Sequence, residues 1–202
     1  MRLKMVPEGL HLTSAQYGWI AGVTALLAGI AIAILARQVE PARFRRLHGP
    51  IVVAAAVFWT GYGLLLFALT WEAFYARFLP DPANRSLGRS VVGLLIYPPI
   101  GLVLWWLASR LPGNPAITFC LLGGLEALPE HWWGIYRLGM LERVPFLRDV
   151  SPASVLAFAV PEYALYWASV LGIALVLRAA WTRIGIRGGS RSASGADHPT
   201  SV

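Results

Sequence analysis

Five long apolar stretches divide the chain, at 17–35, 51–74, 90–107, 115–136 and 154–181. A helix rises about 1.5 Å per residue, so about 20 apolar residues cross the hydrocarbon core of a bilayer. The polar segments between the stretches are too short to fold by themselves. The pattern predicts an all-α fold, a polytopic membrane helix bundle with about five transmembrane helices.

The composition agrees with this architecture. Hydrophobic residues make up 57% of the 202 residues and charged residues only 13%, whereas charged residues reach about 25% in soluble domains. We therefore predict one transmembrane helical domain over 1–187. The tail over 188–202 is predicted to be disordered, because its residues are mostly small and polar and form no apolar face. The first stretch starts too late and is too long for a signal peptide. We expect an integral membrane protein of the bacterial inner (cytoplasmic) membrane.

Charge and cysteine content exclude several classes of function. The formal net charge is +7, which suits loops that rest on anionic lipid, so we expect membrane lipids and not nucleic acid as partners. The single cysteine, Cys120, excludes a disulfide framework. The chain has neither paired aspartates for magnesium nor histidines on two spans for haem. We expect no metal and no cofactor, and the oligomeric state is not predicted.

Five acidic or histidine side chains lie within the predicted spans: Glu72, Glu126, Glu130, His131 and Glu162. A charged residue at the centre of a membrane helix costs about 2.5–3.5 kcal/mol on insertion scales, so each is a candidate catalytic residue. Successive spans run in opposite directions, and all five residues therefore fall toward the same side of the membrane. A shared cavity that opens to that side is expected.

Two of these acids, Glu126 and Glu130, are four residues apart and share one helix face. Repulsion between the two carboxylates, together with burial, favours a proton on one of them, and such an acid can donate it to a substrate. The structural alternative is an ion pair with arginine or histidine that locks helices together.

A proline precedes an acid twice, in Pro129-Glu130 and in Pro161-Glu162. Proline within a helix removes one backbone hydrogen bond and kinks the helix, which can direct the neighbouring carboxylate toward a central cavity. Ordinary kinking of a helix bundle is the alternative, because proline is common in membrane helices.

Aromatic side chains near the acids are candidates for substrate binding, because the faces of their rings stabilise positive charge. An aromatic belt at the membrane surface is the alternative for each of them. The candidates are Trp71, Tyr75, Trp132, Trp133, Tyr163 and Trp167.

The segment 69–75, LTWEAFY, is followed by Pro80. It resembles the Trp-Glu-x-x-Tyr stretch of small integral-membrane terpene cyclases, which act in fungal meroterpenoid and indole-diterpene pathways and have bacterial relatives. In that family an acid in an early span and an acid in a late span are proposed to be essential. The resemblance places Glu72 at the first position and Glu162, in the segment 161–166, at the second. It covers two short patches, and the fungal members have seven spans.

The resemblance implies a terpene cyclase that acts on a lipidic isoprenoid. A protonated carboxylic acid would donate its proton to an epoxide or alkene of a polyprenyl chain, and successive double bonds would attack the resulting carbocation. Glu72 would be the general acid and Glu162 its partner or the final base.

Three other functions remain open from the sequence. The same acids suit a sterol or lipid double-bond isomerase, which would resemble the emopamil-binding protein superfamily. A non-catalytic helical subunit of a larger membrane assembly would use the acids to pair helices. A proton-coupled transporter would use them to carry protons, although the chain shows no clear inverted repeat beyond the two Pro-Glu pairs.

Overall fold

The computed structural model describes residues 12–64 and 81–193, and this part of the chain is helical without any strand. The helices are α1 (Ser14–Gln38), α2 (Pro41–Phe44), α3 (His48–Tyr62), α6 (Pro82–Val91), the π-helix η2 (Val92–Ile96), α7 (Tyr97–Ala108), α8 (Pro115–Tyr136), α9 (Met140–Arg143), the 3-10 helix η3 (Pro145–Leu147) and α10 (Pro152–Ala193). The prediction of an all-α fold is confirmed.

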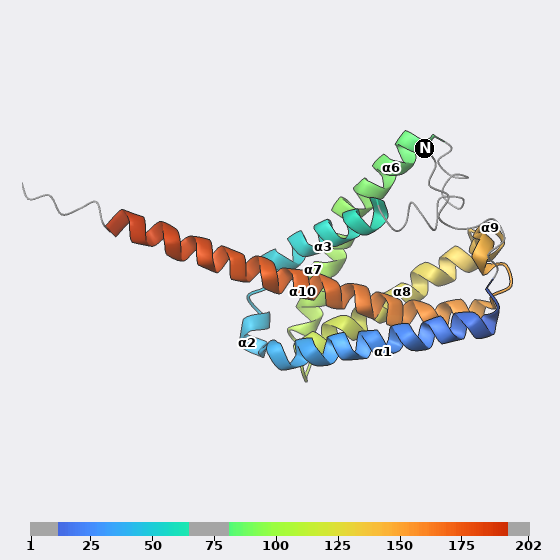
Figure 1. Ribbon diagram of the computed structural model, residues 1–202, viewed down its shortest axis with the longest axis horizontal. Coiled ribbons are helices and arrows are strands. Elements are labelled where there is room, and N and C mark those ends of the chain that lie inside the picture. The colour runs from blue at the N-terminus through green and yellow to red at the C-terminus, as the bar shows by residue number, and fades with distance from the viewer. Residues whose placement is uncertain (1–11, 65–80, 194–202) are drawn as a thin grey trace, which may run out of the picture.

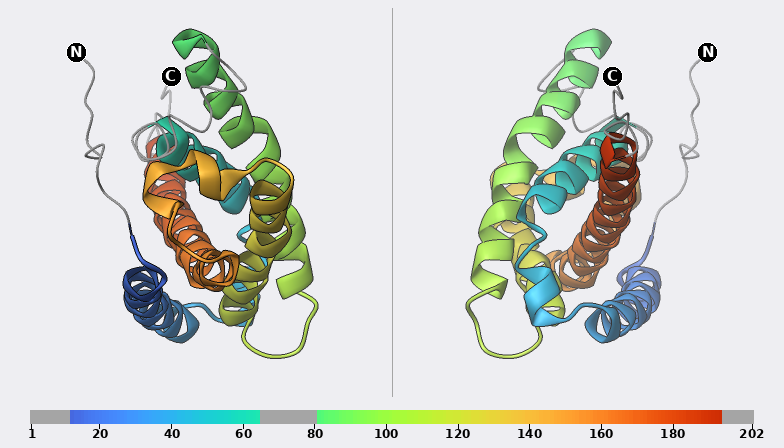
Figure 2. Two further views of the ribbon diagram at one scale, coloured as in Figure 1. Left: turned by 90° about the vertical axis from the view of Figure 1, so that its right-hand side faces the viewer. Right: turned by 90° about the vertical axis from the view of Figure 1, so that its left-hand side faces the viewer.

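Helix α10 is the centre of the arrangement, because it packs against α8, α1 and α3. Figure 1 shows α1 and α10 running in the same direction with α8 antiparallel to them, and α10 extending past the other helices at its C-terminal end. The views in Figure 2 show α1 at the outside of the bundle, beside α10. Helices α3 and α7 pack against each other on another side of α10.

Two adjacent glycines let α8 approach α10 closely. A Cβ atom on Gly123 would lie 2.1 Å from Cδ1 of Trp167, and one on Gly124 would lie 2.7 Å from the backbone oxygen of Val160. Small residues at such contacts are typical of helix packing in membranes, where close approach of the backbones supplies the van der Waals energy. The indole of Trp167 is fully buried at this contact.

Local signals in the sequence set the start of α8. Asn114 is the N-cap, and its Oδ1 accepts a hydrogen bond from the backbone N–H of Ala116 at 2.9 Å, while Pro115 occupies the first turn. The Asn114 amide also donates to the backbone oxygen of Ala36 at 2.9 Å, which ties the start of α8 to the end of α1. The predicted span 115–136 coincides with this helix.

The predicted span 90–107 is part of a longer helical segment, which begins at Pro82 and changes from α6 through the π-helix η2 to α7. Pro98 and Pro99 have no N–H groups, so α-helical bonding to the preceding turn is interrupted. In the π-helix the N–H of Tyr97 instead donates to the oxygen of Val92, five residues earlier. Tyr97 enters the core directly after this irregular turn.

Two described helices are long and apolar enough to cross a membrane by length and composition, Ser14–Gln38 and Pro152–Arg183. Large apolar side chains on α1 point away from the bundle, with Trp19 79% and Leu26 64% exposed. Apolar surface of this kind indicates contact with lipid or with another protein. The count of five spans stays a prediction, and so does the boundary at residue 188 between the transmembrane domain and the disordered tail. The backbone of α10 is helical up to Ala193.

Candidate active site

Glu130 on α8 is held by two tyrosines from different helices. The Tyr163 hydroxyl on α10 donates to Glu130 Oε2 at 3.0 Å, and the Tyr97 hydroxyl on α7 donates to Glu130 Oε1 at 3.2 Å. The two hydroxyl oxygens are 3.5 Å apart. Both carboxylate oxygens of Glu130 are thus hydrogen-bond acceptors, and three helices meet at this acid.

Glu162 on α10 belongs to a second hydrogen-bond group. The Tyr166 hydroxyl, one helical turn later on α10, donates to Glu162 Oε1 at 2.5 Å. The hydroxyl oxygens of Tyr166 and Tyr62 are 3.2 Å apart, which connects the group to the end of α3. We call these six residues, Glu130, Glu162, Tyr62, Tyr97, Tyr163 and Tyr166, the acid–tyrosine cluster.

Trp59 on α3 joins the two hydrogen-bond groups. Its ring stacks on that of Tyr97 with 3.7 Å between centroids and 8° between planes. It also contacts Tyr163 and Tyr166 at centroid distances of 5.4 and 5.6 Å. Trp59 therefore packs against the rings of these tyrosines, and aromatic faces favour positive charge nearby.

Glu126 and His131 lie beside the cluster on α8. Glu126 Oε2 and Trp167 Nε1 are both buried, and neither has a hydrogen-bond partner among the described residues. The His131 ring meets the Tyr163 ring edge to face at 5.4 Å, and its Nδ1 is 3.0 Å from the backbone oxygen of Ala127.

Burial differs sharply between the members of the cluster. Tyr97 and Tyr163 are only 8% and 6% exposed. Glu162 is half-buried, whereas Glu130 is exposed on the surface of α8. Glu130 is therefore the exposed acid of the cluster, and its hydrogen bonds place it where α7, α8 and α10 meet.

The structure brings together most of the predicted site residues that it describes. Glu126, Glu130, His131, Glu162, Tyr163 and Trp167 lie in or beside the cluster. Trp132 and Trp133 do not join it, because they face outward on α8 with 46% and 54% exposure, which suits the alternative of an aromatic belt. Glu72, Trp71 and Tyr75 lie outside the described residues.

Four members of the site were not among the predicted site residues: Trp59, Tyr62, Tyr97 and Tyr166. Tyr166 was recognisable, because it follows Glu162 by four residues and shares its helix face. Tyr62 and Tyr97 lie near the middle of the predicted spans 51–74 and 90–107, so neither their depth nor their spacing in the sequence pointed to the site.

The donor set of this site suits proton transfer. Among the described side chains, Glu130 and Glu162 accept hydrogen bonds from tyrosine hydroxyls and not from arginines. Within the described residues, no three His, Cys, Asp or Glu side chains gather as a metal site would require. Carboxyl and hydroxyl groups in hydrogen-bond contact can pass a proton between them.

Comparison with protein-family models, curated proteins and solved structures finds no match.

Proposed function

We propose that this protein is an integral-membrane terpene cyclase, which uses carboxylic acids to start and end a carbocation cyclisation of a polyprenyl or epoxy-polyprenyl substrate. One observation carries the proposal: two carboxylates, Glu130 and Glu162, are each hydrogen-bonded to tyrosines within one aromatic cluster. Acids supply and remove protons, and the aromatic rings favour the cation between those steps.

The proposed setting is a bundle of about five membrane spans in a bacterial cytoplasmic membrane. The lengths and apolar composition of α1 and α10 support membrane insertion. Helix α8 has 22 residues, so its length of about 33 Å would reach across the hydrocarbon core, although by composition only α1 and α10 are apolar enough among the described helices. A substrate dissolved in the bilayer would reach the exposed Glu130 without passing through water.

The reaction balances without an external reagent. A protonated carboxyl group gives its proton to the terminal alkene, forming a C–H bond, or to the epoxide oxygen, after which a C–O bond breaks. The electron pair of an internal alkene then attacks the cation and closes a ring. Loss of a proton to a carboxylate forms the final double bond, so the product is an isomer of the substrate.

The roles of the acids follow from their partners and from the resemblance. The resemblance makes Glu72 the acid and Glu162 its partner or the final base. Glu162 accepts a hydrogen bond from the Tyr166 hydroxyl, which lies within hydrogen-bond distance of the Tyr62 hydroxyl. A proton can therefore move along these three groups. Glu130 accepts two hydrogen bonds, which suits a carboxylate that takes up the final proton.

The test is to incubate membranes that contain the wild type or a variant with polyprenyl and epoxy-polyprenyl substrates, and to identify products by mass spectrometry and NMR. We expect a cyclised isomer of unchanged mass. Glu162→Gln and Glu130→Gln should lower its rate by about 10²–10⁴-fold, the usual contribution of a positioned acid or base. Glu142→Gln is the matched control, because Glu142 is exposed on α9, and its rate should equal that of the wild type.

Other products would replace the proposal. A shifted double bond without a new ring would indicate the isomerase function. If no substrate is converted and the Glu130 and Glu162 variants are merely unstable, the acids are structural and the protein is a membrane subunit.

A further inference from the structure

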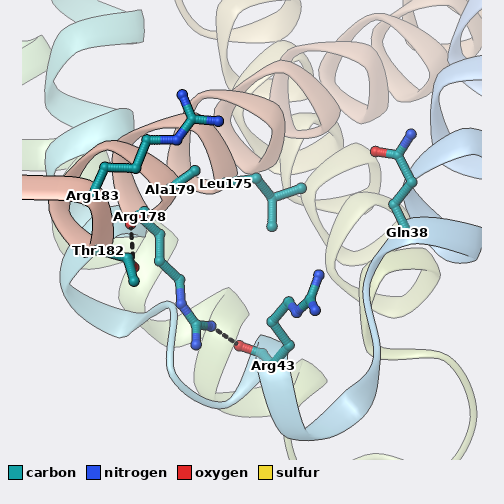
Figure 3. Close-up of a pocket in the computed structure, with 7 residues that line it drawn as sticks. All are labelled: Gln38, Arg43, Leu175, Arg178, Ala179, Thr182 and Arg183. Atoms are coloured by element: carbon teal, nitrogen blue, oxygen red, sulfur yellow. Dashed lines mark hydrogen bonds between the residues drawn. The ribbon is translucent and has the colours of Figure 1, made fainter. Parts of the chain in front are cut away.

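A basic groove lies at the other end of α10 from the acid–tyrosine cluster (Figure 3). It is an open groove of about 660 Å³ between the end of α1, helix α2 and the last part of α10. Arg178 follows Glu162 by 16 residues on the same helix, which places them about 24 Å apart. The groove is therefore separate from the proposed reaction site.

Arginines from two elements line this groove. Arg43 comes from α2, and Arg178 and Arg183 come from α10. No acidic side chain is among the described residues that line it, and Glu40, the acid closest in sequence to Arg43, is not part of the lining. Three positive charges without an acidic residue in the lining make this surface favourable for an anion.

One of these arginines is held in place. The guanidinium Nη1 of Arg178 donates to the backbone oxygen of Arg43 at 2.7 Å, so the two basic residues are tied across the groove (Figure 3). Arg178 is half-buried, and the other N–H groups of its planar guanidinium remain available for a ligand. The Arg183 side chain points away from Arg43 in Figure 3.

The groove combines this charge with apolar surface at the end of the apolar part of α10. Leu175 contributes to the lining, and the next residue, Val176, is 69% exposed on α10. Arg178 follows directly after this apolar segment, as Arg37 follows the apolar segment of α1. Apolar side chains and basic side chains therefore meet at one level, as they do at the boundary between hydrocarbon and head groups.

We propose that this groove binds the phosphate group of an anionic phospholipid, with Arg43 and Arg178 as the phosphate ligands and Leu175 against an acyl chain. The planar fork of an arginine matches two phosphate oxygens. A phosphate ester on a lipid presents its charge beside a hydrocarbon chain, which is the combination that the groove offers. This site goes beyond the proposed catalytic function and does not depend on it.

The experiment measures lipid retained by the full chain, purified in mild detergent, by native mass spectrometry. The probes are phosphatidylglycerol and phosphatidic acid, with zwitterionic phosphatidylcholine as the comparison lipid. Arg43→Gln removes one guanidinium but keeps the backbone oxygen that Arg178 binds, and Arg178→Gln removes both the charge and that hydrogen bond. Arg148→Gln is the matched control, because Arg148 is exposed and precedes the start of α10.

We expect the wild type to retain the two anionic lipids and not phosphatidylcholine. Arg43→Gln and Arg178→Gln should each weaken retention about fivefold, the factor that one basic side chain near an anionic surface contributes. Arg148→Gln should retain lipid as the wild type does. Equal retention of all three lipids, or equal losses in all three variants, would overturn the proposal.

A second arm separates a lipid phosphate from a free phosphate. Glycerol 3-phosphate is added to the complex of the wild type with phosphatidylglycerol. If the lipid stays bound, the acyl chain contributes and the lipid assignment holds. If the soluble phosphate displaces the lipid, the groove recognises phosphate alone, and the assignment to a lipid is wrong.

Discussion

Gly123 offers a direct test of the packing that supports the candidate active site. In Gly123→Ala the new Cβ would lie 2.1 Å from Cδ1 and 2.4 Å from Cγ of Trp167, whereas ordinary contacts begin at 3.4 Å. The indole is fully buried, with Phe119 and Trp59 packed edge to face at 5.6 and 5.9 Å. It has no free space to enter, so α8 and α10 must move apart.

The size of the effect follows from this overlap. The Cβ would be about 1.3 Å too close to the ring, and overpacking of a tight core costs about 1–3 kcal/mol. The hydrogen bond from Tyr163 to Glu130 also spans α8 and α10, and its loss would cost about 0.5–1.5 kcal/mol. The greater helix propensity of alanine offsets about 0.5–1 kcal/mol. We expect a net loss of about 2 kcal/mol in the free energy of unfolding, within a range of about 0.5–4 kcal/mol.

Thermal unfolding in mild detergent, followed by far-ultraviolet circular dichroism, measures this loss. A chain of this size changes its melting temperature by about 2–4 °C per kcal/mol. Gly29→Ala on α1 is the matched control, because a Cβ there meets no atom within 4 Å, and it should be as stable as the wild type or slightly more so. Equal melting temperatures for Gly123→Ala and the wild type would refute the packing argument.

Two further predictions concern α8. Asn114→Ala removes the N-cap of α8 and the hydrogen bond to Ala36, and it should lower the free energy of unfolding by about 1–2 kcal/mol in the same assay. Asn114→Asp keeps the cap acceptor and should lower this free energy less. An equal loss in both variants would contradict the role of the cap. Cys120 is fully buried, so a maleimide reagent should label it only after denaturation, whereas Thr182→Cys on the exposed part of α10 should be labelled in the folded protein. Rapid labelling of Cys120 in the folded wild type would contradict its burial.

The sequence by itself determined the helices, because the signals for them are local. The runs of apolar residues predict where the main helices lie, and for α8 the run matches the whole helix, whereas polar residues lengthen α10 and precede α7. Asn114-Pro115 marks the start of α8 where the structure has it. An equivalent signal, Asp81-Pro82, precedes α6, where Asp81 Oδ1 accepts a hydrogen bond from the N–H of Ala83 at 2.9 Å. The helical segment therefore begins before the predicted apolar span 90–107, whose apolar part the structure has as Val92–Ala108. Helical spacing also placed Glu126 and Glu130 on one face of α8.

Only the tertiary structure decided which residues meet those acids. Helical periodicity shows which side chains share a face, but a helix that is apolar all round does not reveal which face is buried. The hydrogen bond from Tyr97 on α7 to Glu130 on α8, and the outward position of Trp132 and Trp133, depend on how neighbouring helices are rotated. That rotation is set by contacts between helices, such as Gly123 against Trp167, and residues far apart in the chain supply them.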